Sequence, residues 1–428
     1  MKTIFLALAC LLPFTSYANK PSSQAAPANW YDDFIFKNPT FTFEMIRTLG
    51  YSVSQAADIG EVIFTARAIR EGDVYSWKKE WLATADRIYD LASQYDGKGQ
   101  NISAQEAYYR ASNYYRTACF FLDAKKDRSD SIEIWQKSVD SFQKGIRFDS
   151  SISVVQIPYQ KTTLPGYFIK AETLNAPLVI IQTGFDGTKE EIYFEAGMAA
   201  RQRGYNVLLF EGPGQGQVIK SQDIPFRYDW EKVITPVVNF AMRFDSIDQK
   251  KIALIGISMG GYLAARAVAF EHRIAACVLN GGIFDFSENL YRSIPPEVID
   301  LLQENSPQFN HIMTAQMAKD VNTYWFFNNA MWTMKADTPA VAMRALTQYT
   351  LKGVVQKIKC PTLVIDSEGD MFMKGQPQKV YDQLKSPKTF LKFSPETTAQ
   401  AHCQMGANMI SNESIFSWLD ETLGWKKP

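Results

Sequence analysis

Six short apolar segments alternate with longer stretches of helical spacing in the second part of this chain. The segments are 177–183, 206–210, 251–257, 274–279, 361–365 and 388–393. Continuous apolar runs of this length are typical of parallel strands buried on both faces, and the stretches between them supply crossover helices. Two earlier segments, 153–159 and 165–171, alternate like antiparallel strands. The sequence therefore predicts an α/β protein with an eight-stranded, mostly parallel sheet.

The first part of the chain shows a different pattern. Segments 56–70, 76–95 and 103–122 carry apolar residues at three- and four-residue spacing, which is the mark of amphipathic helices. Ser103 and Glu106 form a capping-box pattern that predicts the start of the third helix. We expect an N-terminal helical cap domain over residues 41–150, followed by the sheet domain over residues 151–428.

One stretch interrupts the strand rhythm of the sheet domain. Residues 284–356 contain no strand pattern and are rich in large side chains, among them Trp325, Phe326 and Trp332. Their position between the sixth and seventh predicted strands indicates a helical lid inserted into the domain. Such a stretch fits a substrate-facing surface and an ordinary buried helix face equally well.

The N-terminus has the features of a secretory signal. Lys2 gives a positive start, residues 4–14 are apolar, and Ser16-Tyr17-Ala18 fits a cleavage site. The apolar run is too short to span a bilayer, so no stable membrane anchor is expected. We predict a signal peptide over 1–18, a flexible lead-in over 19–40, and an exported protein that is periplasmic or secreted after cleavage near Ala18.

The balance of charges bears on whether the protein binds nucleic acid. Lys and Arg together number 45, as do Asp and Glu, so the net charge is zero. This balance argues against nucleic-acid binding, which needs a basic surface. Three scattered His residues without an HExxH or CxxC pattern predict neither a metal site nor a cofactor.

A nucleophile motif stands at the end of the fifth predicted strand. Gly256-Ile257-Ser258-Met259-Gly260 follows the apolar run 252–255 and opens the helix-like segment 262–270. Strand, sharp turn and helix form the context that a GxSxG nucleophile elbow requires. Together with the predicted sheet, this motif indicates the α/β-hydrolase fold, with Ser258 as the nucleophile.

A serine nucleophile needs a base and an orienting acid, which in this fold follow it in the order acid, then His. His402 is the one histidine that follows the last predicted strand. The acid is expected after the seventh strand, where Asp370 has the usual offset. Asp366 and Glu368 compete for this position, and Asp285 is a more distant alternative.

The loops at the carboxyl ends of the strands supply the remaining site predictions. The N–H of Met259 at a helix start and the N–H of Phe185 are expected to form the oxyanion hole. Asp186 and Glu211 border the same face, where each is predicted to bind substrate. For Glu211, an alternative is that it caps backbone N–H groups of a tight Gly-Pro turn.

Several longer motifs carry a resemblance to a known family. They are Gly60-Glu61, Gly72-Asp73, Ser76-Trp77, Glu80-Trp81, Ser103-Ala104-Gln105-Glu106-Ala107-Tyr108, Arg110-Ala111-Ser112-Asn113-Tyr114-Tyr115-Arg116, Gly187-Thr188-Lys189-Glu190-Glu191, Glu211-Gly212-Pro213-Gly214-Gln215-Gly216 and His402-Cys403-Gln404. From about residue 40 to 425 the chain resembles the α/β-hydrolase family of 2,6-dihydroxypseudooxynicotine hydrolase, the fungal heptaketide hydrolases of pigment synthesis and related esterases.

The resemblance implies roles for particular residues. Ser258, Asp370 and His402 match the family's triad, and Met259 and Phe185 match its oxyanion-hole positions. Asp186 falls where the nicotine-pathway enzyme has a glutamate that assists C–C cleavage. The family is typically dimeric, so a homodimer is expected, with the N-terminal helices and the insert forming the cap.

These observations together predict an enzyme with a small-molecule acyl or ketone substrate. It is a secreted serine hydrolase that cleaves an ester or a ketone-activated C–C bond through an acyl-enzyme on Ser258. Two other functions remain open at this point. One is a peptidase of the prolyl-oligopeptidase type, and the other is a non-catalytic binding protein on a hydrolase scaffold.

Overall fold

The computed structural model describes residues 30–428 except residues 124, 293 and 305. The predicted signal peptide over 1–18, and residues 19–29 of the predicted lead-in, lie outside the described residues.

An eight-stranded sheet forms the centre of the chain from residue 152 onward, with the strand order β1-β2-β4-β3-β5-β6-β7-β8. The pairs β1–β2 and β2–β4 are antiparallel, and all other neighbours are parallel. The predicted α/β-hydrolase sheet is therefore confirmed. The strands are β1 (Ile152–Tyr159), β2 (Thr162–Ile169), β3 (Ala176–Gln182), β4 (Asn206–Phe210), β5 (Ile247–Ile257), β6 (Ala276–Asn280), β7 (Thr362–Ser367) and β8 (Lys388–Phe393).

The central strands are apolar because both of their faces are covered. Every residue of β3, β4 and β6 is buried. Along β3, Leu178 and Ile180 pack into one hydrophobic cluster and Val179 and Ile181 into another, on the opposite face. Each such side chain contributes roughly 1.5–3 kcal/mol by leaving water. The covering helices are α6 (Lys189–Ile192), α7 (Met198–Gln202), α8 (Gly216–Gln222), α9 (Glu231–Ala241), α10 (Met259–Val268), α16 (Gln376–Gln383) and α17 (Asn408–Leu423).

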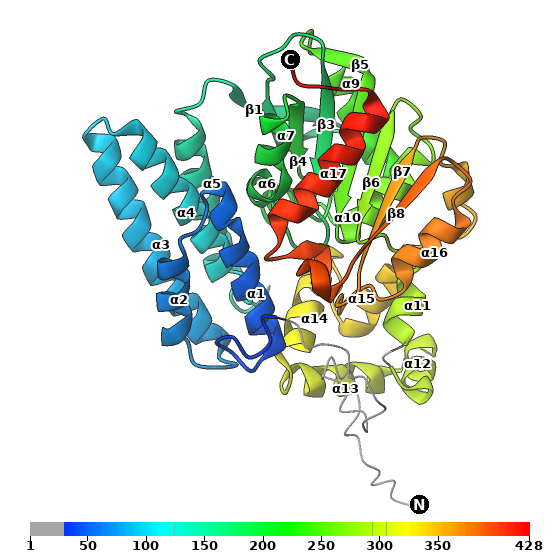
Figure 1. Cartoon of the computed structure of the whole chain (residues 1–428). Helices are drawn as coiled ribbons and strands as arrows, with labels where there is room; N and C mark the ends of the chain where they lie inside the picture. The colour runs from blue at the N-terminus through cyan, green and yellow to red at the C-terminus, as the bar shows by residue number, and fades with distance from the viewer. Residues whose placement is uncertain (1–29, 124, 293, 305) are drawn as a thin grey trace, which may run out of the picture.

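In the described part of the chain, five α-helices precede the sheet and pack along one side of it, at the blue to cyan end of the colours in Figure 1. They are α1 (Pro39–Gly50), α2 (Ile59–Ala68), α3 (Val74–Gly97), α4 (Asn101–Ala118) and α5 (Arg128–Ile146). The capping-box interpretation of Ser103 is wrong, because α4 begins at Asn101. Gly99 has a φ of 70° and turns the chain between α3 and α4, so the helix starts directly after this turn.

A group of helices joins β6 to β7, where a lid is predicted. These helices are α11 (Phe286–Tyr291), α12 (Pro296–Gln303), α13 (Pro307–Met317), α14 (Val321–Thr333) and α15 (Pro339–Leu346). Side-chain caps fix several of their starts, including Asp285 for α11 and Asp320 for α14. In Figure 1 they lie below the sheet, next to the lower end of α1. The candidate active site lies between the sheet, α1 and the helices that join β6 to β7.

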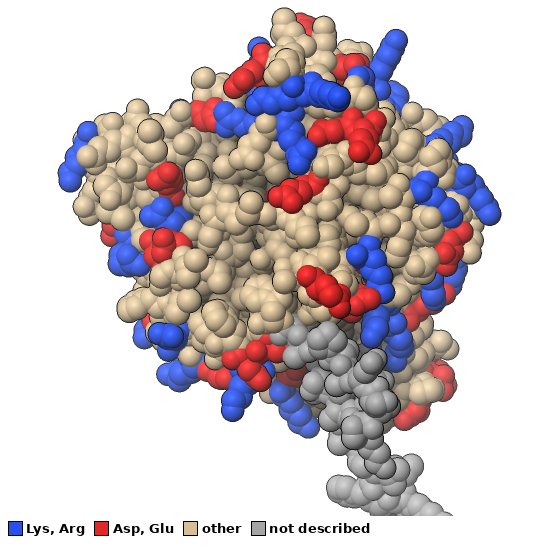
Figure 2. All heavy atoms as spheres, viewed as in Figure 1, with Lys and Arg blue, Asp and Glu red and all other residues tan. Residues whose placement is uncertain are grey.

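The surface and the helix lengths give two further observations. Figure 2 shows acidic and basic side chains interspersed on the visible face. In the part of the chain that the structure describes, no helix is both long and apolar enough to cross a membrane.

Candidate active site

Ser258 lies at the turn between β5 and α10, in a strained backbone conformation. Its φ is 60° and its ψ is −130°, a region that residues with side chains rarely occupy. The flanking glycines permit the turn, since a Cβ on Gly256 would lie 2.0 Å from the carbonyl oxygen of Gly260. The turn places the serine hydroxyl beyond the carboxyl end of the sheet, as a nucleophile elbow does.

His402 connects Ser258 to Asp370. Its Nε2 lies 2.9 Å from Ser258 Oγ, and its Nδ1 lies 2.7 Å from Asp370 Oδ2. The other oxygen of Asp370 accepts hydrogen bonds from the N–H groups of Phe372 (2.7 Å) and Met373 (2.9 Å). The structure thus brings together the three side chains that the sequence assigned to a triad.

Burial and neighbouring charges shift the pKa values of Asp370 and His402 in opposite directions. Burial alone would raise the pKa of Asp370, but His402 and the two backbone N–H groups hold this pKa below its ordinary value. Burial alone would lower the pKa of His402, but the adjacent Asp370 raises this pKa well above its ordinary value. Asp370 therefore stabilises the imidazolium that forms when His402 accepts a proton.

Two of the three competing acids pair with other residues. Glu368 pairs with Lys392 (2.6 Å). Asp285 caps α11 and pairs with Lys352 (2.6 Å). Asp370 has its position because the turn after β7 directs it toward His402, on the loop after β8.

The two predicted oxyanion donors lie on neighbouring loops. Met259 is the first residue of α10, so its N–H has no partner within the helix. Gly184, directly before Phe185, passes so close that a Cβ on it would lie 2.7 Å from the Met259 nitrogen. The carbonyl of Phe185 is held by Asn329 of α14 (3.0 Å). Helix α14 therefore fixes the loop that carries the second predicted donor.

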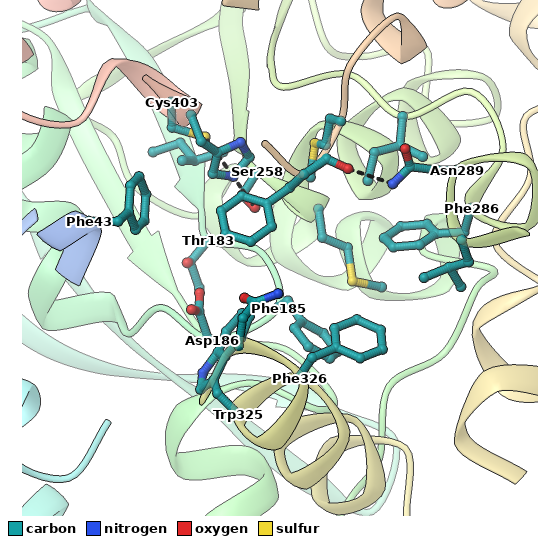
Figure 3. A pocket seen from close by; sticks show the side chains of 18 of the residues that line it. Phe43, Thr183, Phe185, Asp186, Ser258, Phe286, Asn289, Trp325, Phe326 and Cys403 are labelled. Atoms are coloured by element: carbon teal, nitrogen blue, oxygen red, sulfur yellow. Dashed lines mark hydrogen bonds between the residues drawn. The ribbon is translucent and has the colours of Figure 1, made fainter. Parts of the chain in front are cut away.

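A cavity of about 130 Å³ opens beside Ser258 and His402. Most of its wall is apolar and comes from α1, the loop after β3, the lid helices and the loop after β7. Figure 3 shows Phe43 and Cys403 on one side of Ser258 and Phe286 on the other, while Trp325 and Phe326 form the wall on α14. This chamber suits a small molecule with apolar groups next to its reacting carbonyl.

One wall of the chamber is polar, and sequence reasoning missed most of it. Arg47 on α1 donates to both oxygens of Glu191 (2.7 Å each) and to Asp186 (3.1 Å). Glu44 and Glu195 also line the cavity, and each has a buried carboxylate oxygen without a hydrogen-bond partner. The signal in the sequence was the pair of charges on Glu44 and Arg47, three residues apart in an otherwise uncharged helix.

The pKa values of these two glutamates reflect their surroundings. Burial, countered in part by Arg47, raises the pKa of Glu44 to about 7. Burial and then the neighbouring Glu191 raise the pKa of Glu195 to about 8. At neutral pH Glu195 is therefore mostly protonated and Glu44 is present in both forms, so this wall offers carboxyl groups that can donate as well as accept hydrogen bonds.

Of the two predicted substrate-binding carboxylates, Asp186 lines the chamber and Glu211 does not. Glu211 is fully buried and accepts from the N–H groups of Lys189 (3.0 Å) and Gln217 (2.8 Å). It also pairs with the ammonium of Lys189 (3.3 Å). Its contacts thus fit the alternative in which it caps a tight turn.

Comparisons with known proteins place this geometry in a family. A family model described as serine aminopeptidase, S33, matches residues 176–398. Over 415 residues the chain is 32% identical to 20-hydroxy-prefusarin hydrolase FUS2 of Gibberella moniliformis, covering 92% of this chain and 99% of that protein. This chain belongs to the α/β-hydrolase family.

One further relative and one solved structure are similar to this α/β-hydrolase over most of its length. The alpha/beta hydrolase psoB of Aspergillus fumigatus is 32% identical over 91% of the chain and 94% of its own length. The crystal structure of 2,6-dihydroxy-pseudo-oxynicotine hydrolase shares the fold, with a TM-score of 0.68, 20% identity, and coverage of 89% of this chain and 97% of that one. The family assignment made from the sequence is confirmed, and the protein is an enzyme of the hydrolase class.

Proposed function

We propose that this α/β-hydrolase is a serine hydrolase that cleaves an ester or a ketone-activated C–C bond through an acyl-enzyme on Ser258. The observation that carries the proposal is the pair of short contacts from Ser258 to His402 and from His402 to Asp370, at the wall of an apolar chamber. A serine hydroxyl is a weak nucleophile, and this arrangement supplies the adjacent base that activates it.

The proposed reaction has two stages. Ser258 Oγ attacks the substrate carbonyl while His402 Nε2 takes the hydroxyl proton, and the N–H groups of Met259 and Phe185 stabilise the oxyanion. The bond to the leaving group then breaks, and His402 returns the proton to the leaving oxygen or carbon. Water, deprotonated by His402, attacks the acyl-enzyme and releases the acid, which restores Ser258.

The polar wall supports the C–C branch of the proposal. Cleavage next to a ketone leaves an enolate, whose charge must be stabilised by hydrogen-bond donors. The protonated carboxyl of Glu195 and the protonated fraction of Glu44 are donors of this kind, and both residues line the chamber. Relatives carry names such as 20-hydroxy-prefusarin hydrolase, which is consistent with a small organic substrate.

Product analysis tests the proposal and separates the two bonds. The purified enzyme is incubated with p-nitrophenyl esters of graded acyl length and with aryl 1,3-diketones, and products are followed by absorbance and mass spectrometry. We expect turnover of at least one class, and Ser258→Ala to abolish it. Absence of turnover for both classes, or equal rates for Ser258→Ala, contradicts the proposal.

A peptidase is the second candidate, because the matching family model is described as serine aminopeptidase. Such an enzyme needs a carboxylate for the substrate amine, and Glu44, whose pKa of about 7 leaves part of it ionised at neutral pH, lines the chamber. Aminoacyl and N-acyl-aminoacyl p-nitroanilides are added to the same panel of substrates. They distinguish a peptidase from an esterase or C–C hydrolase. Faster cleavage of an anilide than of every ester and diketone favours the peptidase.

A further inference from the structure

A second cavity, of about 80 Å³, lies beside the reaction chamber. Its walls come from the end of α4, from α5, from α8 and from the lid helix α14. Phe185, Asp186 and Trp325 line both cavities, so these three residues form a shared partition. The two cavities therefore adjoin at these residues, and the second cavity is where the end of a long substrate remote from Ser258 would lie.

The ammonium of Lys220 is the main charge of this second cavity. It lies 4.0 Å from the ring centroid of Trp332 and donates to Ser131 Oγ (3.2 Å). It makes no ion pair with any residue that the structure describes, whereas the buried Lys189 pairs with two carboxylates. Burial lowers the pKa of Lys220, so its charge is unfavourable until an anion is bound.

Hydrogen-bond donors without acceptors accompany this lysine. The indole N–H groups of Trp135 and Trp332 are buried and have no hydrogen-bond partner in the described structure. Both residues line the second cavity, and Trp135 is only 2% exposed. Buried polar groups are nearly always paired in folded proteins, so unpaired donors grouped around one cavity indicate that an acceptor is missing.

The cavity offers little to satisfy these donors itself. Among the described residues that line it, Asp186 is the single carboxylate, and Asp186 is bound to Arg47 (3.1 Å) on the partition. Arg116, another lining residue, adds a second positive charge, which lies 3.4 Å from Glu191. The cavity therefore carries an excess of donors and positive charge over acceptors.

We propose that the second cavity is a subsite for a carboxylate at the remote end of the substrate, bound by Lys220 and the indole N–H groups of Trp135 and Trp332. The inference rests on the proposed function, because it places the reacting carbonyl of the same molecule at Ser258. It narrows the substrate class to acyl compounds that carry an acidic group beyond the partition formed by Phe185, Asp186 and Trp325.

A series of dicarboxylic acid monoesters tests this subsite. Mono-p-nitrophenyl esters of succinate to sebacate are compared with the same compounds whose free acid is methylated. We expect kcat/KM to favour the free acid by about tenfold or more at one chain length, since a charge-assisted hydrogen bond has about this value. In Lys220→Met this preference disappears, and in Lys79→Met, an exposed lysine on α3, it remains.

Two results would overturn the subsite. One is equal kcat/KM for free and methylated acids at every chain length. The other is a preference of the same size in Lys220→Met as in the native enzyme.

A binding measurement keeps the subsite separate from the reaction. Suberate monomethyl ester is titrated into Ser258→Ala while tryptophan fluorescence is followed, because Trp135 and Trp332 line the subsite. We expect saturable quenching that is weakened at least tenfold by adding Lys220→Met. Lys220-dependent binding without turnover of any ester or diketone would contradict the proposed function and support the subsite, whereas turnover without Lys220-dependent binding would support the proposed function and contradict the subsite.

Discussion

At the scale of single residues, His402 is held between a nucleophile and an acid. Its Nε2 must be unprotonated to accept the Ser258 proton, and Asp370 raises the pKa of its imidazole. We therefore expect kcat/KM to rise with pH through an apparent pKa above 6.5, the ordinary value for His.

Removing the charge of Asp370 tests this coupling. In Asp370→Asn we expect kcat to fall by about 10³–10⁴-fold. The midpoint of the pH–rate profile should shift downward, because the imidazolium loses its stabilising anion. Asp366→Asn is the matched control, since Asp366 lies near the end of β7, before the turn that carries Asp370, and is not hydrogen-bonded to His402. An unchanged midpoint in Asp370→Asn contradicts the assignment.

The raised pKa of Glu195 predicts a separate effect, on how the stability of the protein depends on pH. Its pKa is raised to about 8 in the folded protein, from 4.5, so the folded state binds its proton more tightly than the unfolded state does. The resulting stabilisation is fully present below pH 4.5 and is lost as the pH rises through about 8.

Glu195→Gln should therefore lose less stability than the native protein between pH 5 and pH 9, by on the order of a few kcal/mol. Urea unfolding at several pH values measures the difference. Glu413→Gln, an exposed position on α17, serves as the control. Parallel pH profiles for Glu195→Gln and the native protein would show that Glu195 is ionised in the fold.

At the scale of elements, α1 connects the N-terminal helices to the hydrolase domain. Arg47 of α1 reaches Glu191 of α6 through two hydrogen bonds of 2.7 Å, and both side chains are buried. Removing one partner of a buried ion pair typically costs about 3–5 kcal/mol. Here Arg116, 3.4 Å from Glu191, compensates part of the remaining charge, so the lower end of this range applies.

We expect Arg47→Met to lower the free energy of unfolding by about that amount, and Arg67→Met, at an exposed position of α2, to change it little. Chemical denaturation with two probes, far-UV circular dichroism and tryptophan fluorescence, checks this. Equal stability of the two variants would contradict the view that α1 is anchored by charge.

The elements differ in how far the sequence determines them. The buried strands were predictable because continuous apolar runs have few other uses, and Ser258 was predictable because its turn needs Gly256 and Gly260. The start of α4 was not, since a turn at Gly99 allowed the helix to begin before Ser103. Local patterns specify periodicity well and boundaries poorly.

At the scale of the whole molecule, the site joins segments that are far apart in the chain. His402 could be paired with Ser258 from the sequence because chain order is a property of the fold. The partnership of Arg47 with Glu191 could not, because it depends on how the N-terminal helices dock on the sheet. The second cavity also lies at this junction, so no single segment predicts it.

The predicted N-terminal signal peptide is expected to direct export of the whole protein. We propose cleavage near Ala18, which would give a mature protein that begins at Asn19. Expression with the native N-terminus in a bacterial host, followed by fractionation and intact-mass measurement, checks this. A full-length mass in the cytosolic fraction contradicts the proposal, and replacement of residues 4–14 by polar residues should prevent export.

The most direct test of the central claim is covalent labelling of the nucleophile. The native enzyme is treated with a fluorophosphonate probe and digested, and the modified peptide is sequenced by mass spectrometry. We expect a single adduct on Ser258, lost in Ser258→Ala and strongly slowed in His402→Ala. No adduct on the folded native enzyme, or equal labelling of Ser258→Ala, would contradict the claim that Ser258 is an activated nucleophile.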